Sequence, residues 1–212
     1  MKDYQKLFLD IAIKSQSLQF GEFTLKSGRI SPYFFNAANM LGGSNLYELA
    51  KCYMDAINDK GLEFNCIYGP AYKGIFLGSI VATLFSENGK NYPLSFNRKE
   101  EKDHGEGGNI IGKKPEDKVL IIDDVLSAGT AGRESIETIL KLSATPSCFI
   151  VGLDRQEKGL SDISSSRELE KEFNIKVESI VNLESLISFV EDNSNYQNHL
   201  EELSNYRKNW GA

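Results

Sequence analysis

Asp123 and Asp124 are the residues whose type and spacing most directly suggest chemistry in this sequence. They follow the aliphatic run VLII at 119–122 and precede Ser-Ala-Gly-Thr. Two neighbouring carboxylates repel each other, so a site that keeps both ionised needs hydrogen-bond donors or a cation. The hydroxyls of a sugar can donate to both carboxylates, and Mg²⁺ is the other natural partner.

The residues after the two aspartates favour an anion site. The segment SAGTAG at 127–132 supplies backbone N–H groups in a tight loop, and Ser127 and Thr130 add hydroxyl donors. Gly129 and Gly132 permit close approach of a ligand, and the exposed N–H groups of a helix start bind anions. In the simpler alternative, an Asp ends a strand and caps the next helix. We favour carboxylates that bind ribose hydroxyls beside a loop that holds a phosphate.

Two other phosphate-binding patterns do not fit this sequence. No Lys follows the glycines where a Walker loop requires one, and the chain contains no G-x-G-x-x-G segment.

Hydrophobic periodicity predicts the elements that must position this site. Strands alternate with helices along most of the chain, and near-continuous apolar strands argue for a parallel sheet covered on both faces. Because ligands of such sheets collect at the carboxyl ends of strands, we expect Asp123 and Asp124 there. Helices are expected at 1–15, 44–61, 75–89, 133–142, 166–173 and 183–191, and strands at 64–69, 92–96, 118–123, 147–154 and 175–181. The segment 18–37 predicts two further strands that turn at Ser27-Gly28.

Composition restricts the class of protein. The 212 residues are 41% hydrophobic and 25% charged, which is ordinary for a globular domain, and the net charge of -6 argues against binding to a nucleic-acid backbone. No apolar run approaches the ~18 residues of a membrane span. Cys52, Cys66 and Cys148 have no metal-ligand spacing and are expected to be reduced core thiols. We therefore expect a cytoplasmic protein with no nucleic-acid or membrane partner.

The segment VLIIDDVLSAGTA resembles the phosphoribosyl pyrophosphate (PRPP) signature of type I phosphoribosyltransferases. This resemblance implies an α/β fold with a central parallel sheet, helices on both sides and a small N-terminal cap, or hood. We expect one domain over residues 1–212, with residues 1–40 contributing to the hood. The resemblance also implies that residues 123–131 bind PRPP, namely Asp123, Asp124, Val125, Leu126, Ser127, Ala128, Gly129, Thr130 and Ala131.

Four other segments resemble the orotate phosphoribosyltransferase family, and they occur in the order typical of it. They are LKSGRISPYFFN at 25–36, GPAYKGI at 69–75, FNRKEEKDHGEGG at 96–108 and LDRQE at 153–157. The implied reaction joins orotate to PRPP and gives orotidine 5′-monophosphate and pyrophosphate in pyrimidine (UMP) biosynthesis. It is a Mg²⁺-dependent transfer by a glycosyltransferase.

Two segments are implied to bind the pyrophosphate of PRPP. In GPAYKG, Tyr72 and Lys73 face it, although a plain strand-to-helix turn is the simpler interpretation. The polar stretch after residue 97 cannot bury a face, and the resemblance makes it a loop that closes over the partner subunit's site. Arg98 lies on the pyrophosphate side, whereas Lys99, Lys102 and His104 reach across. The 98–110 loop therefore implies a homodimer.

The base is implied to contact Lys26, Phe34, Phe35, Ser127 and Arg155. Lys26 is also near PRPP, Phe34 and Phe35 lie against the flat pyrimidine, and Arg155 meets the orotate carboxylate, which suits its planar fork. The family commonly has Thr where this chain has Ser127. The hydroxyl is retained, so only a methyl contact is affected.

The expected mechanism is positioning with electrostatic stabilisation. The implied catalytic residues are Arg98, Lys102, His104, Asp123 and Asp124: the carboxylates favour a cationic ribose, and the basic groups stabilise the leaving pyrophosphate. Because substrate oxygens can supply most ligands of Mg²⁺, we assign no protein metal ligand. The alternatives are a phosphoribosyltransferase for another base such as a purine, a nucleic-acid-binding regulator with this fold, and a catalytically inactive homologue.

Overall fold

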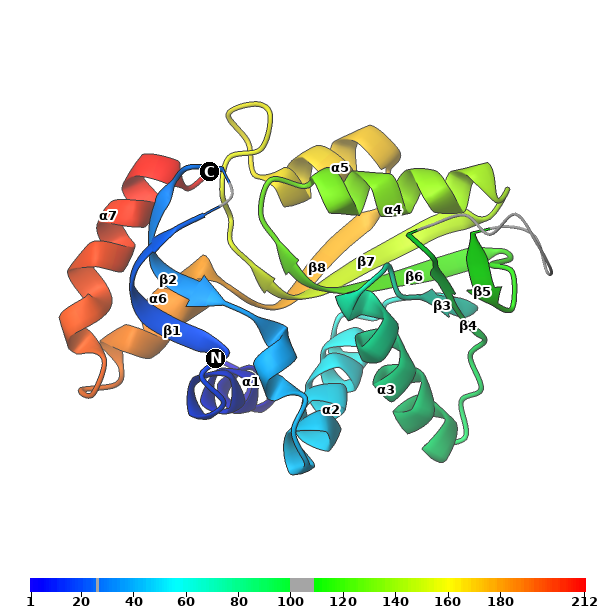
Figure 1. The fold of residues 1–212 in the computed structure, drawn as a ribbon, viewed down its shortest axis with the longest axis horizontal. Coiled ribbons are helices and arrows are strands. Elements are labelled where there is room, and N and C mark those ends of the chain that lie inside the picture. Colours follow the sequence, from blue (N-terminus) through cyan, green and yellow to red (C-terminus); the bar gives the residue numbers. More distant parts are fainter. Residues whose placement is uncertain (26, 100–108) are drawn as a thin grey trace.

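The computed structural model describes residues 1–25, 27–99 and 109–212 (Figure 1). Its main sheet has six strands in the order β5-β4-β3-β6-β7-β8, and all neighbours are parallel except β4 and β5. The strands are β3 (Cys66–Tyr68), β4 (Leu94–Asn97), β5 (Ile110–Gly112), β6 (Lys118–Leu126), β7 (Thr145–Asp154) and β8 (Lys176–Asn182). The expected α/β class with a mostly parallel sheet is confirmed.

Helices cover both faces of this sheet (Figure 1). On one face α1 (Asp3–Lys14), α2 (Ser44–Asp59) and α3 (Lys73–Glu87) pack side by side. On the other face lie α4 (Thr130–Lys141) and α5 (Ser165–Phe173), which contact β6, β7 and β8. None of the described helices is long and apolar enough to cross a membrane.

The hood is built from both ends of the chain. The antiparallel pair β1 (Leu18–Thr24) and β2 (Ile30–Phe35) contacts the C-terminal helix α7 (Leu200–Trp210), which also contacts α6 (Leu183–Glu191). Short 3₁₀ turns, η1 (Ala37–Met40) and η2 (Gln197–His199), connect these parts. The sequence indicated the hairpin but not α7, whose face carries only Leu203 and Tyr206 as buried residues.

The centre of the sheet holds the core. Residues 119–122 of β6 and 148–151 of β7 are buried, and the hydrophobic clusters on the two faces meet across these strands. Burial on both faces removes apolar surface from water along the whole strand, which explains the continuous apolar runs. Cys52, Cys66 and Cys148 are free and buried, as expected.

Several element boundaries differ from expectation. The strand β6 continues past Asp123 to Leu126, because ladder pairing with β7 persists to Asp154. Helices α3 and α4 begin at Lys73 and Thr130, earlier than their apolar periodicity indicated. The short antiparallel strand β5 was not expected in a polar, glycine-rich stretch.

Candidate active site

Asp123 and Asp124 lie near the carboxyl end of β6, which runs toward the side of the molecule that carries the β1–β2 hairpin (Figure 1). Asp124 is 5% exposed, and its backbone N–H donates to Oδ1 of Asp123 over 2.9 Å. From α2, the hydroxyl of Tyr53 donates to the backbone carbonyl of Asp123 over 2.7 Å. This bond fixes the strand where the carboxylates begin.

Lys73 lies against the second carboxylate. Its Nζ atom is 2.6 Å from Oδ2 of Asp124, so the first residue of α3 forms an ion pair with β6. The Asp124 side chain is 7% exposed and that of Lys73 is 36% exposed. The cation is therefore accessible to a ligand, whereas the carboxylate is largely enclosed.

The pair of carboxylates has unusual electrostatics. Burial, and then the nearby charge of Asp124, raise the pKa of Asp123 to about 7, and Lys73 opposes this rise. Close like charges of this kind titrate as a pair. A ligand that donates hydrogen bonds or brings positive charge would favour the ionised form of both groups.

The turn from β3 into α3 places Tyr72 and Lys73 beside this pair. The Ala71–Tyr72 peptide bond is cis, and the Ala71 N–H donates to Oδ1 of Asn97 over 2.8 Å. A Cβ on Gly69 would lie 2.0 Å from the carbonyl oxygen of Gly74. Only glycine allows the backbone to fold back this closely. Tyr72 is 68% exposed.

The loop after β6 presents backbone donors. Ser127, Ala128, Thr130 and Ala131 are exposed, and Gly129 adopts φ 80° before α4 begins. In the described part of the chain, the backbone N–H groups of residues 127–132 donate to no other residue. Such free N–H groups at a helix start attract anions. Val125 is partly buried and Leu126 is buried, so these two residues anchor the loop to the core.

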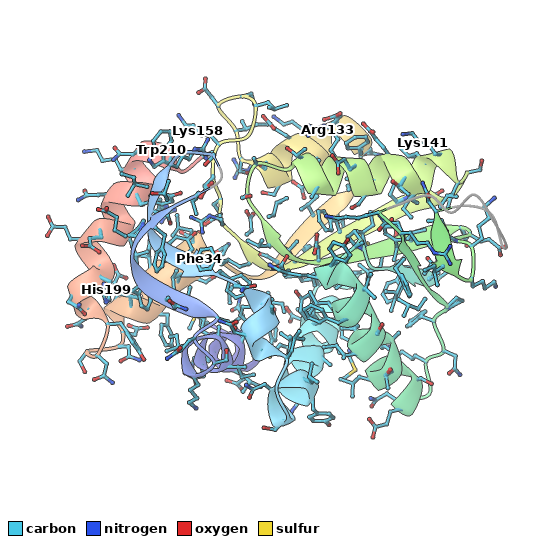
Figure 2. All side chains as sticks on the ribbon, viewed as in Figure 1. Phe34, Arg133, Lys141, Lys158, His199 and Trp210 are labelled. Atoms are coloured by element: carbon cyan, nitrogen blue, oxygen red, sulfur yellow. The ribbon has the colours of Figure 1, made fainter. Side chains whose placement is uncertain are left out.

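The first residue of helix α5 contacts this loop. Ser165 Oγ donates to the carbonyl oxygen of Ser127, and a Cβ on Gly129 would lie 3.3 Å from Cβ of Ser165. The side chains of Arg133 and Glu172 form an ion pair between α4 and α5, and Figure 2 shows Arg133 on the outer side of α4.

Two basic residues implied for pyrophosphate lie in the described chain. The Arg98 N–H donates to the carbonyl of Asn109 over 2.7 Å, just beyond β4. Lys99 Nζ lies 4.6 Å from the ring centroid of Tyr72, so a cation–π contact brings these two implied residues together. Lys26, Lys102 and His104 lie outside the described residues.

The residues implied for the base occupy two faces of β2. Phe34 is 38% exposed and packs on Phe23, whereas Phe35 is buried against Phe8. Figure 2 labels Phe34 on the hairpin. Arg155 is 4% exposed and contacts the opposite face of β2, because its Nη2 donates to Ser31 Oγ over 2.8 Å.

No group of three or more His, Cys, Asp or Glu side chains that could hold a metal occurs among the described residues. Asp123 and Asp124 still offer the oxygen ligands that Mg²⁺ prefers. Their chemistry fits an ion that draws most of its ligands from substrate and water.

Sequence reasoning missed three residues that shape this region: Tyr53, Ser165 and Tyr206. Tyr53 and Ser165 hold the backbone at Asp123 and Ser127, and the Tyr206 hydroxyl accepts from Arg155 over 3.2 Å. Nothing local in the sequence signals the polar contact that each one makes.

Comparison with known proteins identifies the family. No family model matches the chain. An orotate phosphoribosyltransferase of Marinobacter nauticus is 50% identical over 212 residues, and one of Escherichia coli O139:H28 is 47% identical over 213 residues; both alignments cover 100% of each chain. The crystal structure of orotate phosphoribosyltransferase from Francisella tularensis matches with a TM-score of 0.85 and 38% identity, covering 97% of this chain and 100% of that chain. The chain therefore belongs to the orotate phosphoribosyltransferase family.

Proposed function

We propose that this protein transfers the 5-phosphoribosyl group of PRPP to orotate, giving orotidine 5′-monophosphate and pyrophosphate in UMP biosynthesis. The proposal is based on three features that lie together at one edge of the sheet. These are the adjacent carboxylates of Asp123 and Asp124, the cation of Lys73 and the open N–H groups of residues 127–132. Together they suit a ribose that bears a phosphate and a pyrophosphate. Membership of the family supports orotate as the base.

In the proposed site, the carboxylates of Asp123 and Asp124 accept hydrogen bonds from the ribose hydroxyls. Their negative charge also stabilises the positive charge that develops on the ribose as pyrophosphate leaves C1′. The loop 127–131 holds the 5′-phosphate with its N–H groups. The protein therefore contributes position and electrostatic stabilisation more than covalent chemistry.

The leaving pyrophosphate is assigned to the basic residues. Lys73 binds the pyrophosphate either by breaking its ion pair with Asp124 or by contacting both groups at once, and Tyr72 lies beside Lys73. Further positive charge or hydrogen-bond donors come from Arg98, Lys99, Lys102 and His104. Lys26 contacts both substrates. Bound Mg²⁺ would neutralise charge on the pyrophosphate oxygens, with Asp123 and Asp124 as the protein groups suited to its water ligands.

Orotate is assigned to the side of the site formed by the hairpin and the end of β7. The exposed Phe34 ring and the backbone of Phe34 and Phe35 contact the flat pyrimidine, since the Phe35 side chain is buried. Ser127 donates its hydroxyl, and Arg155 pairs with the carboxylate. A nitrogen of orotate then attacks C1′ from the face opposite to pyrophosphate.

The decisive experiment follows the ultraviolet absorbance of orotate with purified protein. We expect loss of the orotate band only when PRPP and Mg²⁺ are both present, and chelation of the metal should stop it. Turnover of a purine instead would overturn the assignment of the base. Turnover of no base would favour a regulator or an inactive homologue, and turnover after chelation would overturn the role of Mg²⁺.

The proposed homodimer has its own test. If the 98–110 loop acts across the interface, Lys102→Ala and Asp124→Asn damage opposite parts of one composite site. Mixing the two inactive variants under subunit exchange should restore about a quarter of wild-type activity, because half of the random dimers carry one intact site. Mixtures that exchange subunits and stay inactive would contradict action across the interface.

A further inference from the structure

A buried polar cluster joins the end of β7 to the C-terminal helix. We define it as Arg155, Glu157, Tyr206, Ser31 and Arg29. Arg155 Nε donates to Oε1 of Glu157 over 2.5 Å, and the Tyr206 hydroxyl donates to the same oxygen over 2.6 Å. Arg29 binds Oε2 of Glu157 over 3.0 Å. Glu157 is 3% exposed, so its charge is satisfied entirely within the cluster.

The cluster fixes the orientation of the Arg155 guanidinium. Nε is occupied by Glu157, and Nη2 donates to Ser31 Oγ over 2.8 Å and to the Tyr206 hydroxyl over 3.2 Å. The ring of Tyr33 lies 4.1 Å from the guanidinium carbon and covers one of its faces. A guanidinium held at two nitrogens and one face has little rotational freedom left.

One edge of the guanidinium is left for a ligand. Nη1 donates to no other described residue. It is not fully buried, so a ligand can reach it. Burial, and then the bond to Glu157, raise the pKa of Tyr206, so its hydroxyl stays protonated and can donate to Glu157 while accepting from Arg155.

Backbone hydrogen bonds connect the segment that follows Arg155 to the C-terminal end of α7. Lys158 N–H donates to the carbonyl of Trp210 over 3.0 Å, and Ala212 N–H donates to the carbonyl of Gln156 over 3.1 Å. Arg29 lies 4.9 Å from the Trp210 ring centroid. Figure 2 shows Lys158 and Trp210 next to each other at this end of α7. The helix is therefore tied to the segment that carries Arg155 at several points.

We propose that Tyr206 and Glu157 are positioning residues for Arg155, through which the C-terminal helix α7 helps to select a base that bears a carboxylate. This inference rests on the proposed function, in which Arg155 pairs with the carboxylate of orotate. Tyr206 and Glu157 touch no substrate themselves; they hold Arg155 with Nη1 directed to the ligand. Loss of Tyr206 or Glu157 frees the Arg155 side chain to adopt other rotamers. Binding of the base must then also order Arg155, and this cost in entropy weakens the binding.

The test is steady-state kinetics of Tyr206→Phe with orotate and PRPP varied separately. We expect KM for orotate to rise roughly tenfold, because a hydrogen bond to a charged group is lost. KM for PRPP and kcat should stay within about twofold of wild type. The lost interaction holds orotate equally in the ground state and in the transition state, so only the binding of orotate is weakened. Glu157→Gln keeps the shape of the side chain and should shift the same constant, which gives a second variant if Tyr206→Phe folds poorly.

A matched control and a double variant separate positioning from stability. Tyr196 packs on Phe20, and its hydroxyl has no partner among the described residues, so Tyr196→Phe should leave both KM values unchanged. If Tyr206 acts through Arg155, then Tyr206→Phe added to Arg155→Lys should raise KM for orotate no further than Arg155→Lys alone.

Three results would overturn the proposal. The first is Tyr206→Phe with a lowered Tm and an unchanged KM for orotate, which means a structural role only. The second is a normal KM for orotate in Arg155→Lys, which would show that Arg155 does not bind the base and that there is no binding group for Tyr206 to position. The third is a wild-type protein without orotate turnover; that result refutes the proposed function and this inference with it, whereas the first two leave the function standing.

Discussion

Lys73 Nζ lies 2.6 Å from Oδ2 of Asp124, and this ion pair links the start of α3 to the carboxyl end of β6. The contact joins the segment implied to bind pyrophosphate to the segment implied to bind ribose. The Asp124 side chain is 7% exposed, and Lys73 is the cation that pairs with this largely enclosed carboxylate. Lys73 can therefore reach a pyrophosphate only if it leaves or shares Asp124.

Lys73→Ala should weaken PRPP binding and lower stability together. We expect KM for PRPP to rise at least tenfold as a charged hydrogen-bond donor is lost. The free energy of unfolding should fall by about 1–2 kcal/mol, less than for a fully buried pair, because the Lys73 side chain is over a third exposed. Steady-state kinetics and urea unfolding measure the two effects.

Lys60→Ala is the matched control for this prediction. Lys60 forms an ion pair with Glu178 outside the candidate site. Its loss should leave KM for PRPP unchanged. If Lys73→Ala behaved like this control, the assignment of Lys73 to pyrophosphate would be wrong.

The pH dependence of activity should report Asp123. Burial and the charge of Asp124 raise its pKa to about 7, so the carboxyl is partly protonated at neutral pH. A protonated Asp123 cannot supply the negative charge that a cationic ribose needs. We expect kcat/KM for PRPP to fall as the pH drops through about 7. In Asp123→Asn this step should be absent and the rate low throughout; a step that persists in the variant would assign it to another group.

Stability should change with pH in the opposite sense. The folded protein binds the Asp123 proton more tightly than the unfolded chain does, since the pKa rises from 3.8 to about 7 on folding. The unfolding free energy contributed by this group is therefore greatest at low pH and declines as the pH rises through that interval. Urea unfolding at about pH 5 and about pH 8 should show a smaller decline for Asp123→Asn than for wild type.

Gly74→Ala should disrupt the turn that carries Tyr72 and Lys73. A Cβ at this position would lie 2.5 Å from Cδ of Pro70 and 2.7 Å from the carbonyl oxygen of Ile122, and neither backbone can move without displacing the site. We expect lower activity and a lower Tm. Gly42→Ala is the control, because its Cβ would meet no atom within 4 Å. Equal Tm and activity for the two variants would show that the turn tolerates a side chain.

Much of the framework could be predicted because it is encoded locally. The run VLII, the two aspartates and the small residues after them indicated a buried strand that leads through a tight loop into a helix, and β6, Gly129 and α4 have that arrangement. The predicted end of β6 was wrong, because hydrogen bonding to β7, a segment distant in the sequence, extends the strand past the two aspartates. The placement of β5 depends in the same way on pairing with β4.

The contacts that refine the site could not be predicted, because they join residues far apart in the chain. Tyr53 reaches Asp123 across 70 residues, Lys73 reaches Asp124 across 51 and Tyr206 reaches Glu157 across 49. Their side chains look like an ordinary core tyrosine, a solvated lysine and a tail residue when each is read in its own segment. Only the packing of the helices on the sheet reveals their polar partners.

Ser165→Ala should loosen the loop that holds the 5′-phosphate. The Ser165 hydroxyl donates to the carbonyl of Ser127, and α5 touches the loop again at Gly129. Without this bond the loop gains freedom that PRPP must remove on binding, so KM for PRPP should rise roughly fivefold. Ser147→Ala is the control: its hydroxyl donates to carbonyl oxygens of Glu63 and Val119 at the start of β6, away from the loop. A rise in KM for both variants would point to a general loss of stability, whereas a rise for Ser165→Ala alone identifies α5 as the support of the phosphate loop.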